Sequence, residues 1–209
     1  QAIKNLYQEG FKQFPCTLLN CGDVMQDAAL FYANKAKCPD FSLPEHFILA
    51  TLHRAENTDS PERLQSIIAA LEEIAREMPV VIPIHPRTRK KLQELNFDFK
   101  QTRLQLVDPV GYLEMVHLLK HCSLVATDSG GLQKEAYFFK KYCITLRTET
   151  EWVELVEQGA NIITGWRYED ILNNYKQLKH TTKDVFSSPL YGDGEAGHII
   201  IRELQRIDS

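Results

Sequence analysis

The sequence predicts an α/β fold in which helices cover both faces of a doubly wound parallel sheet. Short apolar runs alternate with longer amphipathic stretches along most of the chain, which is the pattern of repeated strand–helix units. The chain has 209 residues, of which 44% are hydrophobic and 25% are charged. This composition is ordinary for a globular protein, and the length suits one large domain with a piece of another.

The expected strands are continuous apolar runs, and the expected helices repeat apolar residues every three or four positions. Strands are predicted at residues 47–52, 80–84, 104–107, 123–127, 142–146 and 161–163. Helices are predicted at residues 61–77, 87–95, 112–120, 131–139, 151–158, 168–179 and 194–206. Ser60 and Pro61 are the expected N-cap and first residue of one helix.

The first residues of the chain precede this alternating pattern. We expect a helix at residues 2–10, a strand at residues 16–19 and a helical connection at residues 23–37. The sequence begins at Gln1, inside a predicted helix, which suggests a piece of a longer protein. We therefore predict that residues 1–22 are the remnant of a preceding N-terminal domain and that residues 23–209 form the α/β domain.

Charge and cysteine content exclude several classes of function. The formal net charge is −4, so we expect no binding of nucleic acid or of an anionic membrane surface. The sequence has no run of apolar residues long enough to span a bilayer. The five cysteines follow no zinc-binding spacing, so no metal site is expected. Cys122 and Cys143 are expected to be buried in a reducing cytoplasm.

The sharpest local motif is Thr-Asp-Ser-Gly-Gly at residues 127–131, between a predicted strand and a predicted helix. Adjacent glycines and a serine at a helix start can bind an anion such as a diphosphate. The same residues also suit a tight turn with Asp128 or Ser129 as a helix cap. Glu135 lies one turn into the helix, where it can accept the hydroxyls of a ribose or remain a solvated charge.

Two further motifs follow predicted strands, where ligands of such sheets bind. His53 and Arg54 open the segment His-Arg-Ala-Glu-Asn at residues 53–57. A histidine there can donate a proton to a leaving phosphate, and an arginine can bind a phosphate or carboxylate with two hydrogen bonds. The alternative is a helix-entry cap with surface charges. His85, after the next strand, is either a ligand residue or a hydrogen-bonded structural histidine.

Together these motifs resemble a known family. The segments are residues 51–57 (Thr-Leu-His-Arg-Ala-Glu-Asn), 83–86 (Pro-Ile-His-Pro), 108–109 (Asp-Pro), 127–136 (Thr-Asp-Ser-Gly-Gly-Leu-Gln-Lys-Glu-Ala) and 191–194 (Tyr-Gly-Asp-Gly). Their order and spacing resemble the bacterial non-hydrolysing UDP-N-acetylglucosamine 2-epimerases. The resemblance implies two Rossmann-like domains in a glycosyltransferase-B-like arrangement. This chain is similar to the second, UDP-binding domain, whose last helix returns toward the first.

The resemblance also implies site residues. The UDP site would consist of Val110, Met115, Ser129, Gly130, Gly131 and Glu135. The serine and the glycines would bind the diphosphate, the glutamate the ribose, and the first two residues would border the uracil. His53 would contact the UDP-sugar and assist catalysis. Arg54 and His85 would contact a second UDP-GlcNAc that activates some members.

The activity implied by the resemblance is C2 epimerisation of UDP-GlcNAc to UDP-ManNAc, by anti elimination of UDP and its re-addition. This route uses no cofactor. The family implies a homodimer, a role in cell-surface polysaccharide synthesis, and acid–base carboxylates in the first domain. We therefore expect the isolated 209-residue chain to bind UDP weakly and to be inactive.

One departure from the family pattern concerns the sugar. Residues 151–154 are Glu-Trp-Val-Glu, where many UDP-GlcNAc enzymes have Glu-Arg-Pro-Glu. This pattern is similar to members that act on UDP-2,3-diacetamido sugars or their uronic acids, which are the alternative substrates. A retaining UDP-sugar glycosyltransferase and a UDP-sugar-binding module without catalysis are further alternatives.

Overall fold

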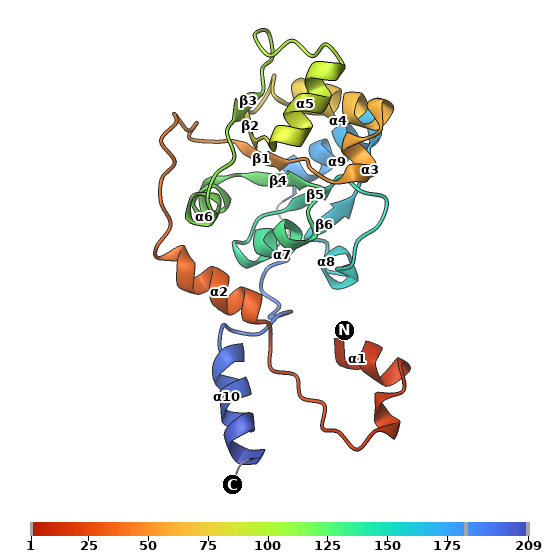
Figure 1. Ribbon diagram of the computed structural model, residues 1–209, viewed down its shortest axis with the longest axis vertical. Coiled ribbons are helices and arrows are strands. Elements are labelled where there is room, and N and C mark those ends of the chain that lie inside the picture. Colours follow the sequence, from red (N-terminus) through yellow and green to blue (C-terminus); the bar gives the residue numbers. More distant parts are fainter. Residues whose placement is uncertain (1, 182–183, 208–209) are drawn as a thin grey trace. The chain divides into compact units, whose positions relative to one another are not determined.

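The computed structural model describes residues 2–181 and 184–207 (Figure 1). The strands are β1 (Ile48–Thr51), β2 (Val80–Pro83), β3 (Gln105–Val107), β4 (Leu124–Thr127), β5 (Cys143–Thr145) and β6 (Asn161–Ile163). The helices are α1 (Ala2–Gln8), the 3-10 helix η1 (Phe11–Gln13), α2 (Val24–Ala33), α3 (Ala55–Thr58), α4 (Pro61–Ile74), α5 (Pro86–Glu94), α6 (Tyr112–His121), α7 (Gly130–Phe138), α8 (Val153–Glu157), α9 (Tyr168–Lys179) and α10 (Ala196–Ile207).

The strands form one parallel sheet in the order β3-β2-β1-β4-β5-β6. The chain builds one half of the sheet outward from β1 and then returns to build the other half from β4. This is the strand order of a Rossmann-like, doubly wound sheet, so the predicted fold class is confirmed. Its topological switch point lies between β1 and β4, where such folds bind their ligands.

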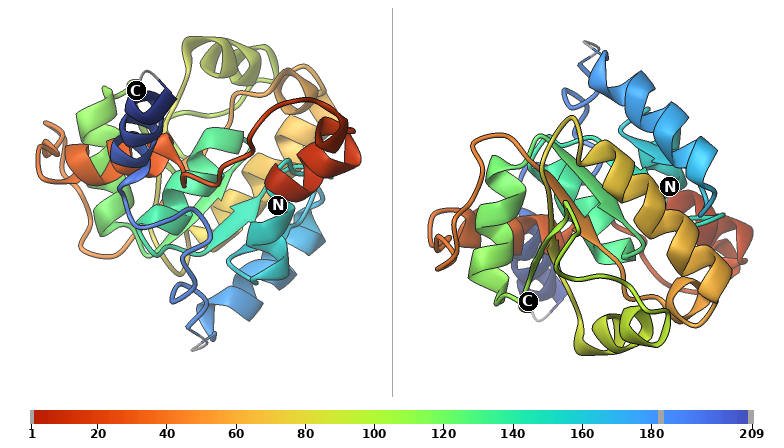
Figure 2. Two further views of the ribbon diagram at one scale, coloured as in Figure 1. Left: turned by 90° about the horizontal axis from the view of Figure 1, so that it is seen from below. Right: turned by 90° about the horizontal axis from the view of Figure 1, so that it is seen from above.

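Alternate side chains of each strand enter two separate cores, one on each face of the sheet. Ile48 and Ala126 pack under α4 and α9, whereas Leu49 and Val125 pack under α6 and α7. Figure 2 shows helices on both faces. Because both faces are covered, the strands need apolar residues at nearly every position, which explains the uninterrupted apolar runs in the sequence.

The helices of the sheet-containing part begin and end close to the expected residues. Ser60 caps α4, as predicted, by accepting a hydrogen bond from the N–H of Arg63 at 3.4 Å. The short helix α3 was not among the predicted elements, because four residues cannot show a helical repeat of apolar side chains. Its first residues belong to the segment that was expected to form a site.

The chain folds as two compact units. One consists of residues Tyr32–Ser187 and contains the sheet; the other contains the chain up to Phe31 and from Ser188 onward. Within the second of these, the carboxylate of Asp27 accepts hydrogen bonds from the N–H groups of Ala196 and Gly197, at 3.2 and 2.7 Å. An acidic side chain therefore caps the N-terminus of α10.

The strand predicted at residues 16–19 does not form, and that prediction was wrong. These residues have an irregular backbone and pair with no strand among the described residues. A strand needs a partner to satisfy its backbone hydrogen bonds, and Leu19 is 48% exposed. The division at residue 22 between a preceding domain and this one stays a prediction. In the described part of the chain, no helix has the length and apolar character to cross a membrane.

Candidate functional site

The ends of β1 and β4 lie side by side at the switch point. Thr51 and Thr127 are paired across the two strands, and their hydroxyl groups are hydrogen bonded at 2.6 Å. The segments that follow these strands carry the two main motifs of the sequence. Since parallel strands end at the same edge, the motif around residue 53 and the motif around residue 129 leave the sheet together.

Asp128 connects these two motifs. Its carboxylate is fully buried and accepts hydrogen bonds from the N–H of His53 at 3.1 Å, the N–H of Arg54 at 2.9 Å and the amide of Asn57 at 3.2 Å. The Asn57 amide also donates to the carbonyl of Leu146, at 2.9 Å. A buried carboxylate requires such donors, so Asp128 binds the turn between the neighbouring strand β1 and α3 rather than the N-terminus of its own helix.

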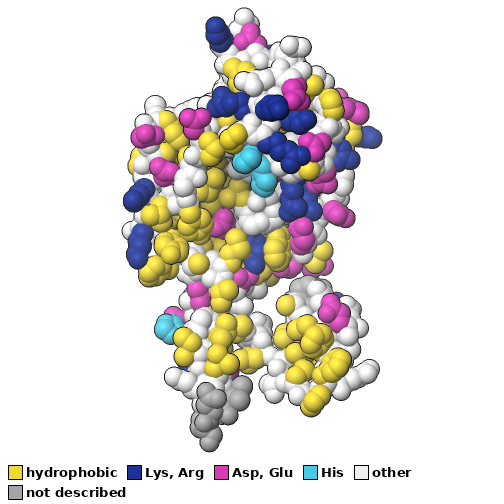
Figure 3. Space-filling view, viewed as in Figure 1, with side chains coloured by type: hydrophobic (Ala, Val, Ile, Leu, Met, Phe, Trp, Pro, Cys, Tyr) yellow, Lys and Arg dark blue, Asp and Glu magenta, His cyan; other side chains and the backbone are white. Residues whose placement is uncertain are grey.

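The imidazole of His53 lies against this carboxylate. Its Nδ1 atom is 3.4 Å from Oδ1 of Asp128, and the histidine side chain is 46% exposed. The other ring nitrogen, Nε2, has no hydrogen-bond partner within the described residues. A carboxylate on one nitrogen orients the ring and leaves the other nitrogen for a ligand. Figure 3 shows exposed histidine side chains beside basic side chains on one face of the molecule.

The start of α7 offers free N–H groups. Ser129 is the N-cap, and its hydroxyl accepts a hydrogen bond from the N–H of Leu132 at 3.4 Å. The N–H groups of Gly130 and Gly131 have no acceptor in the described part of the chain. The expected cap at Ser129 is thus present, and two donors remain for an anion beside the positive end of the helix.

Gly130 lies in close contact with three functional groups. A Cβ atom on this residue would be 3.3 Å from Oε2 of Glu151, 3.6 Å from Nε1 of Trp152 and 3.7 Å from Nη2 of Arg54. The indole N–H of Trp152 donates to the carbonyl of Gly130 at 2.8 Å. Only glycine leaves this space open.

Glu135 is buried farther along α7, with 7% of its surface exposed. Burial raises the pKa of its carboxyl group, and a hydrogen bond from Tyr112 opposes that rise. Burial, with the neighbouring Glu135, raises the pKa of Tyr112 to about 12, so this phenol remains a hydrogen-bond donor. Tyr112 was predicted only as the start of a helix, and no motif in the sequence marked it as a site residue.

A cavity of about 360 Å³ lies beside the start of α6. Val110, one of the expected uracil contacts, lines it, together with Phe41, Pro39 and Glu114. Met115, the other expected contact, is partly buried and packs against the core cluster under α6 and α7. The lining residues before β1 carried no recognisable signal in the sequence.

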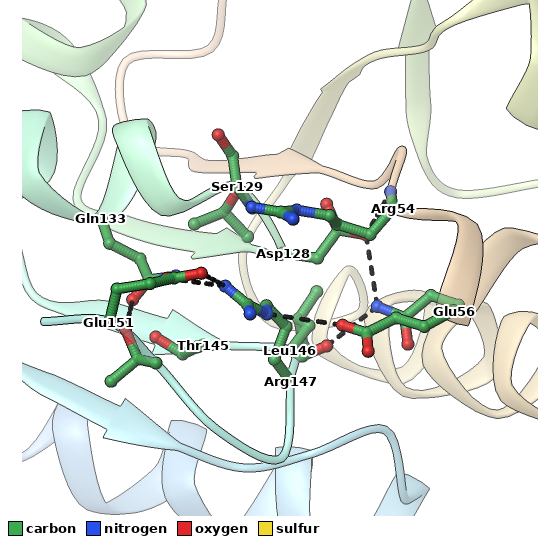
Figure 4. A network of polar contacts seen from close by, with 12 residues as sticks. Arg54, Glu56, Asp128, Ser129, Gln133, Thr145, Leu146, Arg147 and Glu151 are labelled. Carbon is green, nitrogen blue, oxygen red and sulfur yellow. Dashed lines mark hydrogen bonds and ion pairs between the residues drawn. The ribbon is translucent and has the colours of Figure 1, made fainter.

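Arg147 and two glutamates form a polar network at the end of β5 (Figure 4). Nη1 of Arg147 lies 3.0 and 2.9 Å from the two carboxylate oxygens of Glu151, and Nε lies 3.4 Å from Oε1 of Glu56. The hydrogen bonds from Arg147 lower the pKa of Glu151. Sequence reasoning missed this arginine, although it follows a predicted strand as His53 and His85 do.

His85 follows β2, one strand away from His53 in the sheet. It is the N-cap residue of α5, and its Nδ1 atom accepts a hydrogen bond from the N–H of Arg87 at 3.2 Å. The structure thus brings His53 and Arg54 together with Ser129–Gly131. His85 makes the kind of hydrogen bond that we expected of a structural histidine.

Known proteins are similar to this chain in both sequence and fold. Residues 1–205 match the family model described as UDP-N-acetylglucosamine 2-epimerase. A UDP-2,3-diacetamido-2,3-dideoxy-D-glucuronate 2-epimerase of Pseudomonas aeruginosa is 49% identical over 99% of this chain and 58% of the relative. A UDP-N-acetylglucosamine 2-epimerase of Methanocaldococcus jannaschii is 40% identical over 78% of this chain and 45% of the relative.

Solved structures agree with this similarity. The crystal structure of the UDP-GlcNAc 2-epimerase of Methanocaldococcus jannaschii, in complex with UDP-GlcNAc and UDP, matches 98% of this chain and 59% of its own chain, with a TM-score of 0.84 and 35% identity. The chain spans little more than half the length of these relatives. From the family match, the identities and the shared fold, we conclude that the chain belongs to the UDP-N-acetylglucosamine 2-epimerase family.

Proposed function

We propose that this chain supplies the UDP-binding part of a UDP-sugar 2-epimerase. The observation that carries the proposal is the pair of free N–H groups of Gly130 and Gly131 at the start of α7, at the switch point of the sheet. Ser129 adds a hydroxyl group, and Arg54 adds a guanidinium without a hydrogen-bond or ion-pair partner in the described residues. Helix amides and a nearby cation form a suitable site for a diphosphate.

The nucleoside would extend from this diphosphate toward α6. Glu135, which is buried and carries a hydrogen bond from Tyr112, would accept the ribose hydroxyls. The cavity lined by Val110 would take the uracil, with Met115 behind it. A relative with a similar fold has been solved in complex with UDP-GlcNAc and UDP, which supports a nucleotide site in this fold.

The chemistry follows from the weak acidity of the proton at C2, which has no neighbouring carbonyl. In the proposed route the C1–O bond breaks, the electron pair leaves with UDP, and C2 loses its proton, giving a 2-acetamidoglucal. UDP then adds back to C1 while a proton is returned to the other face of C2. The helix amides stabilise the charge that grows on the departing diphosphate, and His53 donates a hydrogen bond or a proton to it.

The sugar is the finer part of the proposal. The two candidates are UDP-GlcNAc and UDP-2,3-diacetamido-2,3-dideoxy-D-glucuronate. The higher identity to the Pseudomonas aeruginosa relative, 49% against 40% for the Methanocaldococcus jannaschii relative, favours the uronate. Binding of a second UDP-GlcNAc at Arg54 and His85, and a homodimer, stay predictions.

The test is turnover of each UDP-sugar by the full-length protein in heavy water. Epimerisation should place deuterium at C2 of the favoured sugar, visible by proton NMR, and His53→Asn should slow it strongly while UDP still binds. A glycosyltransferase or a binding module would leave C2 protonated. Failure of both sugars to exchange at C2 would refute the proposed activity.

A further inference from the structure

One carboxylate lies close to the proposed diphosphate position, and a second lies beside Arg147, which also contacts the first. Oε2 of Glu151 is 3.3 Å from where a Cβ atom of Gly130 would lie, and Glu56 belongs to α3, which begins directly after Arg54. Both side chains are nearly half exposed, at 49% and 44%. Carboxylates beside free helix amides compete with an anionic ligand and repel it, so their presence at this site needs an explanation.

Arg147 contacts both of them. It makes two hydrogen bonds to Glu151 through Nη1, and its Nε atom lies 3.4 Å from Glu56 without forming a hydrogen bond. The arginine side chain is only 8% exposed, and Figure 4 shows it between the two glutamates. Its position therefore suits contact with these carboxylates much better than direct contact with a ligand in solvent.

A contribution of Arg147 to folding stability does not by itself explain this arrangement. Ion pairs whose carboxylates are about half exposed contribute little to folding, because water competes for the charges. Burying the arginine is costly, and its neighbouring cation, Arg54, makes no ion pair in the described residues. The arrangement thus neutralises the acidic side chains mainly through Arg147, while the exposed Arg54, whose charge also helps to lower the pKa of Glu151, makes no ion pair of its own among the described residues.

We propose that Arg147 is a positioning residue, which holds and neutralises Glu56 and Glu151 so that the amides of α7 and the guanidinium of Arg54 remain available to the diphosphate. This inference rests on the proposed UDP site. It assigns the arginine an electrostatic effect on affinity that acts through the glutamates, and it predicts that removing a glutamate compensates for removing the arginine.

The experiment is calorimetric titration of UDP into the full-length protein. Arg147→Met should raise the Kd about tenfold, and Arg147→Lys, which keeps the charge, should change it much less. The double variant Arg147→Met/Glu151→Gln should recover most of the affinity. Arg63→Met is the matched control, because Arg63 lies on α4 and stacks on Trp166 at 5.6 Å; it should bind UDP normally.

Thermal denaturation of each variant identifies any folding defect. A folded double variant that binds UDP as weakly as Arg147→Met would overturn the inference, because it would make the arginine a direct ligand. Wild-type affinity in Arg147→Met would also overturn it. If Arg147→Met does not fold, the single variant Glu151→Gln tests the inference. It should bind UDP at least as tightly as wild type, and weaker binding would contradict the inference. No UDP binding by the wild-type protein would instead refute the proposed function.

Discussion

Replacement of Gly130 by alanine should weaken UDP binding while leaving the stability of the fold nearly unchanged. The added methyl group would lie 3.3 Å from Oε2 of Glu151, a close contact that the carboxylate relieves by moving a few tenths of an ångström. Moving it weakens an ion pair with Arg147 that is partly exposed, at a cost below about 1 kcal/mol. Alanine gains up to about 1 kcal/mol over glycine in a helix. The two effects nearly cancel, so Tm should change by no more than about 4 °C.

The same methyl group fills the space through which a diphosphate would reach the amides of Gly130 and Gly131. Gly130→Ala should therefore raise the Kd for UDP at least about tenfold, or about 1.4 kcal/mol, as measured by calorimetry. Gly197→Ala in α10 is the control, since it has the same gain in helix propensity and a Cβ contact of 3.5 Å. A Gly130→Ala protein with wild-type affinity for UDP would refute the placement of the diphosphate.

Three further predictions concern other residues of the site. Asn57→Leu removes a buried donor to Asp128 and should lower the free energy of unfolding by about 2 kcal/mol, measured with urea; an unchanged midpoint would contradict this. Trp152→Phe removes the N–H that holds the carbonyl of Gly130, so calorimetry should show UDP binding weakened a few-fold with Tm nearly unchanged. Burial raises the pKa of Glu135, so ionisation of this carboxyl group opposes folding. The stability that the protonated carboxyl group contributes is lost as the pH rises through the pKa of the folded state. Glu135→Gln should therefore stabilise the ligand-free protein at about pH 7.5, with an advantage that shrinks in denaturant titrations as the pH falls toward 4.5, the ordinary pKa of a glutamate; an advantage independent of pH would contradict the assignment.

The strands, most helices and the cap at Ser129 were predictable because their signals are local. A strand buried on both faces needs a run of apolar residues, and a helix start needs a capping side chain within three residues. The motif at residues 127–131 is also local, since its glycines and serine lie in one turn. The strand expected at residues 16–19 shows the limit, because apolar residues alone do not provide a neighbouring strand.

The roles of Asp128, Asn57 and Arg147 were not predictable, because each acts through a distant part of the chain. Asp128 is a plausible cap for the helix that follows it, yet its carboxylate binds N–H groups 74 and 75 positions earlier. The partner of a buried carboxylate depends on which strands are neighbours, and the sequence of one strand does not reveal which strand lies beside it.

The fold class, the family and the segments that form the candidate site could be inferred from the amino-acid sequence, since these depend on periodicity and on motifs within short stretches. Which polar groups of the described residues have no partner could be learned only from the folded chain. Among the described residues, the N–H groups of Gly130 and Gly131 and the guanidinium of Arg54 have no hydrogen-bond partner, whereas the carboxylate of Asp128 binds the N–H groups of His53 and Arg54 and Arg147 binds Glu151. Such pairing is settled by the order of strands in the sheet, where residues from β1, β4 and β5 come within hydrogen-bond distance.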